Sequence, residues 1–238
     1  MQALLARVAP HLEPGVEPVV EPGGEPVVDP VVDSVVALNA ELGRESIAQP
    51  RAVPTSRSGP VLRGARLTLR TVQASDITPT HVAWLNDAEV VRFSNQRLLR
   101  HTLDSSLRYW AGFEGGDNLY LSVRRLDNDQ ALGTLTAYCN RHHGTADLGI
   151  LMGERSAWGQ GLGQEAFSLL ADWLARQPGM RKLTCGTLAN NHAMLQVAAR
   201  AGFHREAVRV AQEWVEGQAT DLIYFARFVG SAVDTADA

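Results

Sequence analysis

The sequence predicts an α+β fold, in which a mixed, mostly antiparallel sheet of about seven strands carries helices on both faces. Segments with strand and helix patterns follow one another from Arg63 to Phe228 in the order β-α-α-β-β-β-α-β-α-β-β. Three of these strands are consecutive in the chain, which favours antiparallel pairing. The last of these three strands leads through a glycine-rich turn into a long amphipathic helix, so the chain also contains a strand-to-helix unit.

The first sixty residues are predicted to form a disordered Glu/Pro/Val-rich arm and linker. Residues 13–36 consist of six tetrads (EPGV, EPVV, EPGG, EPVV, DPVV and DSVV), and no Phe, Trp or Tyr occurs in residues 1–60. Repeated proline removes backbone donors, and such a stretch has little apolar surface to bury. The alternative is an arm that docks a partner. We expect one domain over residues 61–230 and a flexible tail over residues 231–238.

The first half of the predicted domain contains two helices between strands. The segment RLTLRT (66–71) alternates apolar and polar residues, as a half-buried strand does. Ser75 is predicted to cap a helix that runs to about Leu85, and a second helix is expected over residues 104–112. The segments LYLSVRRL (119–126) and QALGTLTAYC (130–139) are predicted to form a hairpin around the turn residues 127–129.

The second half begins with ADLGILMG (146–153), the third consecutive strand. Apolar residues recur at helical spacing over residues 161–176, and RKLTCGTL (181–188) follows as a strand. Asn190 or Asn191 is predicted to cap a helix that ends at Gly202. Strands over residues 203–210 and 221–228, joined around Glu216 and Gly217, complete the sheet.

Charge and composition exclude several classes of protein. The net charge of −4 lies entirely in the first sixty residues, so the predicted domain is neutral and has no basic stripe, which argues against nucleic acid as a partner. No apolar run is long enough for a membrane span, and the N-terminus lacks a secretory signal pattern. Cys139 and Cys185 are expected to be reduced, as in a cytoplasmic protein. No metal site is expected, and a homodimer remains an open possibility.

The segment AWGQGLGQEAFSLL (157–170) carries the chemistry, because it follows a strand and opens a helix. Gly159, Gly161 and Gly163 have no side chains, so the backbone can approach a ligand closely. Their N–H groups and the free donors of the helix start suit phosphate oxygens. The segment matches neither a Walker loop nor a dinucleotide fingerprint.

WGQGLGQEA resembles the pyrophosphate-binding motif of the GNAT acetyltransferase superfamily, and most closely that of its RimJ/RimL-like branch. NHAMLQVAARAGF (191–203) resembles the second signature of that family, RLTLRTVQASDI its opening strand and helix, WLNDAEVVRF its acceptor-side segment, and IYFARF its closing strand. The resemblance covers about Arg63 to Phe228. It implies direct transfer of the acetyl group of acetyl-CoA to a primary amine in a ternary complex.

The resemblance also implies which residues hold acetyl-CoA. The pantetheine arm is expected between strands 146–153 and 181–188, beside the backbone of Ile150, Leu151 and Met152. Asn191 is expected at the pantetheine or adenosine end, although it also suits a helix N-cap. The pyrophosphate is expected on the backbone of Trp158, Gly159, Gln160, Gly161, Leu162, Gly163 and Gln164.

Asp147 is the first candidate for the general base, because its place on the strand before the glycine loop is similar to that of the catalytic carboxylate in some GNAT members. A solvated strand carboxylate is the alternative. His143 is the second candidate, on the strength of its ordinary pKa near neutrality. The helix 191–202 lacks the tyrosine with which many family members protonate the thiolate. Ser94, Tyr138, Tyr224 or solvent must then take that role.

The acceptor is expected to bind the connection between the first two helices, which combines aromatic and polar side chains. This stretch resembles that of GNAT enzymes that acetylate nucleotide-linked amino sugars, and Arg92, Arg97 and Arg100 are candidates to hold phosphate. A RimJ/RimL-like protein N-terminal acetyltransferase and a non-catalytic acyl-CoA-binding protein are the two alternatives. The candidate acceptor residues are Trp84, Asn86, Phe93, Asn95, Gln96 and Arg97.

Overall fold

The computed structural model describes residues 59–230, so the predictions for the N-terminal arm and the C-terminal tail fall outside the described residues. The described part forms one eight-stranded sheet in the order β1-β2-β3-β4-β5-β6-β8-β7. The strands are β1 (Val61–Arg63), β2 (Leu67–Thr71), β3 (Leu119–Arg125), β4 (Ala131–Asn140), β5 (Thr145–Met152), β6 (Lys182–Leu188), β7 (His204–Val215) and β8 (Gln218–Phe228).

Eight helices and 3-10 turns join the strands of the described part. The α-helices are α2 (Pro79–Leu85), α3 (Ala88–Val91), α4 (Leu103–Ala111), α5 (Leu162–Ala175) and α6 (His192–Arg200), and the 3-10 turns are η1 (Ala74–Asp76), η2 (Asn95–Leu98) and η3 (Arg155–Ala157). None of the helices among residues 59–230 has the length and apolar character that crossing a membrane requires.

The sheet is antiparallel at every neighbouring pair except β5 and β6, which run parallel. The predicted α+β fold with a mixed, mostly antiparallel sheet is therefore confirmed. The eighth strand is β1, whose three residues pair with Thr68–Arg70 of β2. It was not expected because a three-residue strand is too short to show an alternating pattern.

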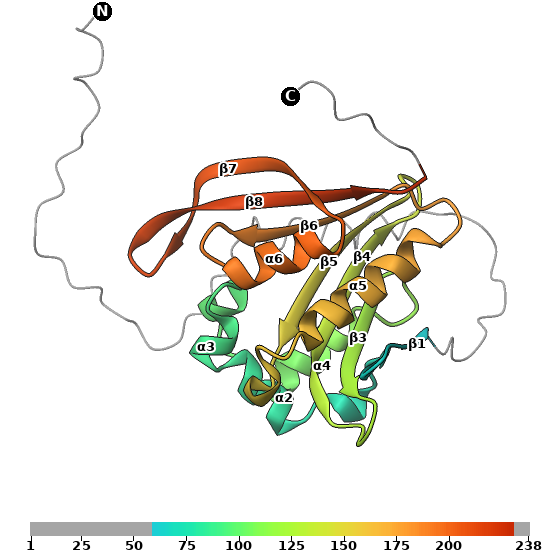
Figure 1. Cartoon of the computed structure of the whole chain (residues 1–238). Coiled ribbons are helices and arrows are strands. Elements are labelled where there is room, and N and C mark those ends of the chain that lie inside the picture. The colour runs from blue at the N-terminus through green and yellow to red at the C-terminus, as the bar shows by residue number, and fades with distance from the viewer. Residues whose placement is uncertain (1–58, 231–238) are drawn as a thin grey trace, which may run out of the picture. The chain divides into compact units, whose positions relative to one another are not determined.

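Helices cover both faces of the sheet. Helices α5 and α6 lie in front of it in Figure 1, and the buried side chains of α5 (Ala166, Phe167, Leu170 and Leu174) belong to the main core. The opposite face carries a smaller core in which Leu107 and Trp110 of α4 pack near Tyr120 of β3. Neighbouring residues of β3 therefore point to different cores, Leu121 to the first and Tyr120 to the second, as the period of a strand requires.

The first predicted helix begins later than Ser75. The Thr78 side chain accepts a hydrogen bond from the His81 N–H, and Pro79 is the first residue of α2. Proline suits this position because its fixed φ matches the helix and its missing N–H costs no hydrogen bond there. Ser75 lies instead in the short turn η1. Strands β7 and β8 extend further towards their turn than predicted, to Val215 and from Gln218.

Candidate functional site

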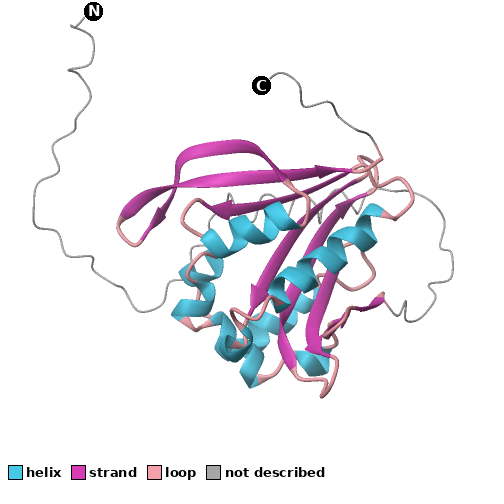
Figure 2. Cartoon of the chain, viewed as in Figure 1, coloured by secondary structure: helices cyan, strands magenta, loops and turns pink. Residues whose placement is uncertain are grey.

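Strands β5 and β6 pair over only three residues each and then diverge. Their register pairs are Thr145–Lys182, Ala146–Leu183 and Asp147–Thr184, whereas β5 continues to Met152 and β6 to Leu188. Figure 2 shows the two strands spreading apart beyond the paired ends. Ile150, Leu151 and Met152 lie on the diverging part of β5, about 10–17 Å along the strand from Asp147. The backbone edge of β5 that faces β6 is therefore without a strand partner there.

The glycine-rich turn needs its glycines for two different reasons. Gly159 and Gly161 have φ values of 71° and 73°, which side chains other than glycine rarely adopt. Gly163 has an ordinary φ, but a Cβ atom there would lie 3.2 Å from Cγ of Met152, so glycine lets α5 approach β5 closely. At Gly159 an added Cβ would meet no atom within 4 Å. The turn therefore leaves open space beside its backbone.

The start of α5 has unused hydrogen-bond donors. Gly161 is the N-cap and contributes no side-chain cap, and the first helical hydrogen bond runs from the Glu165 N–H to the Gly161 carbonyl. The N–H groups of Leu162, Gly163 and Gln164 therefore have no acceptor within the helix. The Gln164 side chain points to α6, where its Nε2 donates to the Val197 carbonyl at 3.3 Å. Because this side chain is directed to α6, Gln164 offers the turn only its backbone N–H, the group on which the pyrophosphate is predicted to rest.

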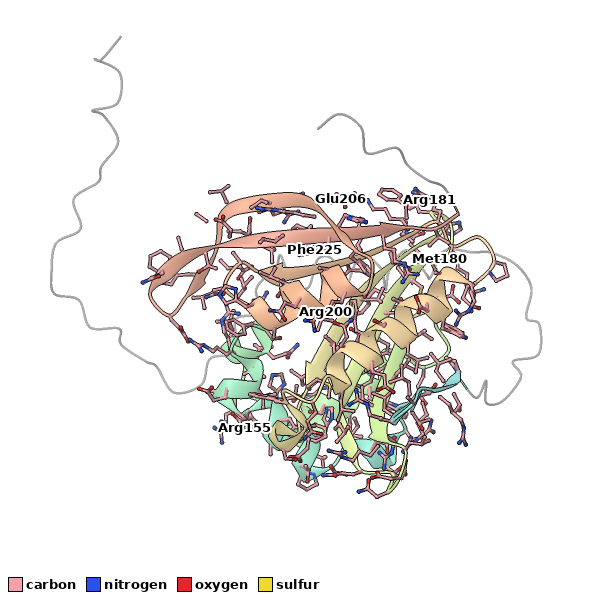
Figure 3. All side chains as sticks on the ribbon, in the orientation of Figure 1. Arg155, Met180, Arg181, Arg200, Glu206 and Phe225 are labelled. Atoms are coloured by element: carbon pink, nitrogen blue, oxygen red, sulfur yellow. The ribbon has the colours of Figure 1, made fainter. Side chains whose placement is uncertain are left out.

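Arg66 fixes the turn from the beginning of β2. Its backbone N–H and its Nε each donate to the Glu165 carboxylate at 2.8 Å, and its Nη1 donates to the Gln160 carbonyl at 2.8 Å. The Trp158 indole donates to the Met152 carbonyl at 2.8 Å, which ties the turn to the end of β5. Arg155, labelled in Figure 3, places its guanidinium 5.7 Å from the Trp158 ring. These contacts attach the turn to the start of β2 and to the end of β5.

Asn191 is the N-cap of α6, at the end of β6. Its Oδ1 accepts a hydrogen bond from the Met194 N–H at 3.2 Å, and its Nδ2 donates to the Thr187 hydroxyl at 3.0 Å. Of the two predicted caps, Asn191 rather than Asn190 is therefore correct. The Asn191 side chain therefore serves as the helix N-cap that the sequence offered as an alternative to acetyl-CoA binding.

Asp147 lies on the last register pair before β5 and β6 diverge, and its Oδ1 accepts a hydrogen bond of 2.5 Å from the Thr184 hydroxyl. Solvent reaches the residue, yet protein atoms surround the carboxyl group on several sides. This burial raises the pKa of Asp147, and the hydrogen bond from Thr184 partly opposes the rise. A carboxylate with a raised pKa is a stronger base than an ordinary one.

Tyr138 is the direct cross-strand neighbour of Asp147 and lies on the same face of the sheet. Its hydroxyl is 2.7 Å from the hydroxyl of Tyr109 on α4. Burial raises the pKa of Tyr138, and the nearby Asp147 carboxylate adds to this rise, so the phenol stays protonated at neutral pH. Tyr224 lies on β8 beneath the Arg209 guanidinium, 5.1 Å from its ring centroid. Tyr138 is thus the tyrosine that adjoins the candidate base.

His143 lies in the turn between β4 and β5, on the side of Asp147 that points away from the diverging strands. Its backbone N–H donates to the Asn140 side chain, and its carbonyl accepts from Arg181. The ladder between β5 and β6 begins at Thr145, so the whole paired segment separates His143 from the diverging part. Asp147 is better placed than His143 for chemistry between the strands.

A cavity of about 540 Å³ lies between the α2–η2 segment and the tip of the β7–β8 hairpin. Three of the predicted acceptor residues, Asn86, Gln96 and Arg97, line it. Asn86 also joins the two ends of its segment, because its side chain donates to the His101 carbonyl and accepts from the His101 N–H, both at 2.9 Å. Helix α3, which lines the cavity through Ala88 and Val91, also contacts β5. The cavity therefore adjoins the diverging strand.

The other predicted acceptor residues lie elsewhere. Trp84 is buried, packs against Gly153 and lines a second, smaller cavity of about 230 Å³. Asn95 accepts a hydrogen bond from Arg97 at 3.0 Å, and Phe93 lies beneath the Arg92 guanidinium. Neither Phe93 nor Asn95 lines these two cavities. The six candidates therefore do not form one pocket.

Sequence reasoning missed the contribution of the hairpin tip. Trp214, Val215 and Glu216 line the larger cavity, although more than a hundred residues separate them from Asn86. The available signal was Trp214 itself, an aromatic residue two positions before the predicted turn at Glu216 and Gly217. Among residues 59–230, no group of three or more His, Cys, Asp or Glu side chains is arranged to hold a metal ion.

Comparisons with known proteins agree with this geometry. A family model described as an acetyltransferase (GNAT) domain matches residues 66–204. No curated protein matches the chain significantly in sequence. Among solved structures, the chain is similar to the ribosomal L7/L12 alpha-N-protein acetyltransferase RimL in complex with coenzyme A, with a TM-score of 0.64 and 18% identity over 71% of this chain and 98% of that chain.

Two further solved structures have different acceptors in their descriptions. One is the spermidine N-acetyltransferase from Vibrio cholerae in complex with CoA and spermine, with a TM-score of 0.61 and 15% identity over 69% of this chain and 96% of that chain. The other is the microcin C7 self-immunity acetyltransferase MccE in complex with acetyl-CoA and AMP, with a TM-score of 0.60 and 14% identity over 70% of this chain and 94% of that chain.

Proposed function

Because the chain belongs to the GNAT acetyltransferase family and is an acetyl-CoA-dependent N-acetyltransferase, we propose that its acceptor is a small-molecule primary amine of the amino-sugar type, free or nucleotide-linked. The observation that carries this proposal is the charge of the larger cavity. Arg92, Arg97 and Arg100 line it together with a single carboxylate, that of Glu216. Such a site attracts an acceptor that also bears an anionic group.

Acetyl-CoA supplies the activated acetyl group as a thioester. The open space at Gly159, the Arg66 guanidinium beside Gly161 and the free N–H groups at the start of α5 suit its pyrophosphate. The strand edge at Ile150, Leu151 and Met152 has backbone groups available for the pantetheine arm, since β6 has diverged there. Trp158 borders the turn, and Asn191 positions α6 on the other side of the diverging strands.

Asp147 is the proposed general base. The acceptor must lose a proton from its ammonium form to become a nucleophile, and the Asp147 carboxylate, whose pKa burial raises, accepts that proton directly or through water. Thr184 holds one carboxylate oxygen, which leaves the other free for the amine. The free amine attacks the thioester carbonyl carbon, the C–S bond breaks, and CoA leaves as a thiolate. The thiolate takes up the second proton of the amine nitrogen through solvent, and Asp147 returns its own proton to solvent. His143 is the second candidate for this role.

The protein N-terminal acetyltransferase of the RimJ/RimL type is the second candidate function, and the similarity of the fold to RimL favours it. A peptide N-terminus is positively charged, so its groove would need carboxylates. The cavity offers three arginines against Glu216 and the adjoining Glu213, which pairs with Arg97, so one positive charge is in excess. Asp87 beside the cavity is paired with Arg155. The charge therefore favours the small, anionic acceptor.

A panel of amines tests the proposal. The full chain is incubated with acetyl-CoA and with nucleotide-linked amino sugars, free amino sugars, polyamines or short peptides, and release of free thiol is recorded. We expect the highest kcat/KM with an amino sugar. A clear preference for peptides would replace the proposal by the RimL-type function. Absence of thiol release with every amine, despite acetyl-CoA binding, would overturn both.

A further inference from the structure

The β7–β8 hairpin has an irregular segment between its base and its tip. The register runs from Arg209–Leu222 to Glu213–Thr220, so Val210, Ala211 and Gln212 of β7 lie opposite the single residue Asp221. Ala211 has a φ of 52°, and its N–H donates to the Asp221 carboxylate at 2.8 Å. Such a bulge interrupts the ladder and bends the strand. The tip, residues 213–220, is therefore joined to the sheet through a break in the regular pairing.

Two ion pairs join this tip to the segment that follows α3. Arg92 donates from Nε and Nη2 to the two oxygens of Glu216, at 2.8 and 3.0 Å. Arg97 lies 3.6 Å from the Glu213 carboxylate and also donates to the Trp214 carbonyl at 3.5 Å. Figure 1 shows α3 below the tip of the hairpin. Together these contacts close one side of the 540 Å³ cavity.

The two ion pairs differ in their exposure to solvent. The side chains of Arg92 and Glu216 are 45% and 56% exposed, whereas those of Arg97 and Glu213 are 15% and 21% exposed. An exposed ion pair stabilises little, because water solvates both partners almost as well. An arginine binds phosphate in the same two-point manner as it binds a carboxylate. Glu216 is thus an exchangeable partner for Arg92 at the edge of the cavity.

A third arginine, Arg100, favours the replacement of the Glu216 carboxylate by a phosphoryl group. Arg100 also lines the cavity and is exposed, and no ion pair to it is found within residues 59–230. A phosphoryl group at this edge would meet Arg92 and Arg100 together and carries more charge than one carboxylate. The Arg97–Glu213 pair would keep the tip attached meanwhile, since it is the more buried of the two.

We propose that Arg92 determines specificity for a phosphorylated acceptor, and that Glu216 occupies Arg92 until the phosphoryl group of the acceptor replaces it. The turn of the hairpin around Glu216 moves away from α3 in this exchange, while the Arg97–Glu213 pair, next to the bulge at residues 210–212, keeps the base of the tip in place. This inference rests on the proposed function for the identity of the acceptor site, but its test measures phosphate binding directly.

Inorganic pyrophosphate is the probe, and its binding is measured by calorimetry in the presence of saturating CoA, so that the glycine-rich turn is already occupied. Glu216→Gln removes the competing charge and should tighten pyrophosphate binding about two- to fivefold, the usual effect of an exposed ion pair. Arg92→Gln should weaken it at least about tenfold. Glu206→Gln is the matched control, because Glu206 lies at the base of the same hairpin, on β7, pairs with Lys182 and is far from the tip (Figure 3).

Movement of the tip gives a second readout. Trp214 is 71% exposed at the tip, so its fluorescence should change when pyrophosphate binds. The change should vanish in Trp214→Phe and should be present without pyrophosphate in Glu216→Gln. Equal pyrophosphate affinity in the unmutated protein, Glu216→Gln and Arg92→Gln would overturn the inference. If CoA itself does not bind, the proposed function fails instead, so the two failures are distinguishable.

Discussion

The Thr184 hydroxyl donates a hydrogen bond of 2.5 Å to the Asp147 carboxylate, and these two residues form the last register pair before β5 and β6 diverge. The candidate base therefore lies where the parallel ladder ends and the unpaired edge of β5 begins. Thirty-seven residues separate the two side chains in sequence, so their contact exists only because β5 and β6 are neighbours in the sheet.

Asp147→Asn should lower turnover by roughly 10²- to 10⁴-fold, the usual contribution of a positioned general base. CoA affinity should remain nearly unchanged, because the glycine-rich turn lies beyond the far end of β5. The deficit should shrink as pH rises and free amine becomes abundant. Initial rates from pH 6 to 10 test this. A deficit that is constant across this range, together with a lower thermal midpoint, would assign Asp147 a structural role.

Thr184→Val should move the acid limb of the pH profile of kcat/KM to higher pH. The hydrogen bond from Thr184 lowers the pKa of Asp147 against the effect of burial, so its loss lets the pKa rise further. The base is active when deprotonated, so a higher pKa delays the rise in rate, while the plateau at high pH should stay the same. A limb that does not move would exclude Asp147 as the titrating group.

Gly161→Asp should abolish measurable CoA binding, whereas Gly161→Asn should weaken it much less. Both side chains tolerate the left-handed backbone at this position, where φ is 73°, better than most residues do. The two variants are similar in size and differ in charge, so the difference in CoA affinity measured by calorimetry isolates electrostatic repulsion of phosphate. Equal affinities in the two variants would contradict the assignment of the turn to pyrophosphate.

Asp76→Asn should destabilise the protein at neutral pH by roughly 1–3 kcal/mol. The substitution removes the carboxylate that accepts two hydrogen bonds from Arg70 and that attracts the positive charge of Arg124. Burial opposes ionisation of Asp76, but the hydrogen bonds from Arg70 and Gln73 and the charges of the arginines outweigh it, so its pKa is lowered. The stabilisation is thus fully present above about pH 4 and is lost as pH falls through the lowered pKa.

Urea unfolding between pH 2.5 and 7 measures this difference, which should shrink at the acid end. Asp104→Asn is the control, because the Asp104–Arg108 pair is almost fully exposed and should matter little. A difference that is independent of pH would show that the loss arises from packing rather than from charge.

A truncated chain that begins at residue 59 should retain acetyl-CoA turnover and a thermal midpoint close to that of the full chain. The eight-stranded sheet, its helices and the core that the structure describes are built from residues 59–230. Thermal unfolding and thiol release on both chains test this. Loss of both properties would place the boundary of the domain inside the predicted arm.

Local patterns in the sequence predicted much of the fold. The alternation in residues 66–71 and the helical spacing in residues 161–176 identified β2 and α5, because side-chain periodicity follows directly from backbone geometry. The glycine-rich turn was recognisable for a similar reason, since a positive φ and free N–H groups are properties of a few consecutive residues. The predicted helix start at Ser75 was wrong, although Thr78 and Pro79 are a local N-terminal signal that the sequence already contains.

The acceptor side depended on the tertiary structure. The sequence indicated Arg92 and Arg97 as candidates to hold phosphate. The structure pairs them with Glu216 and Glu213 of the hairpin, and Arg92 and Glu216 are 124 residues apart. The sequence by itself determined the secondary structure, the family resemblance and the turn that suits phosphate. Only strand order and register decided which charges meet and where β5 and β6 part, because contacts between distant residues depend on the packing of the whole sheet.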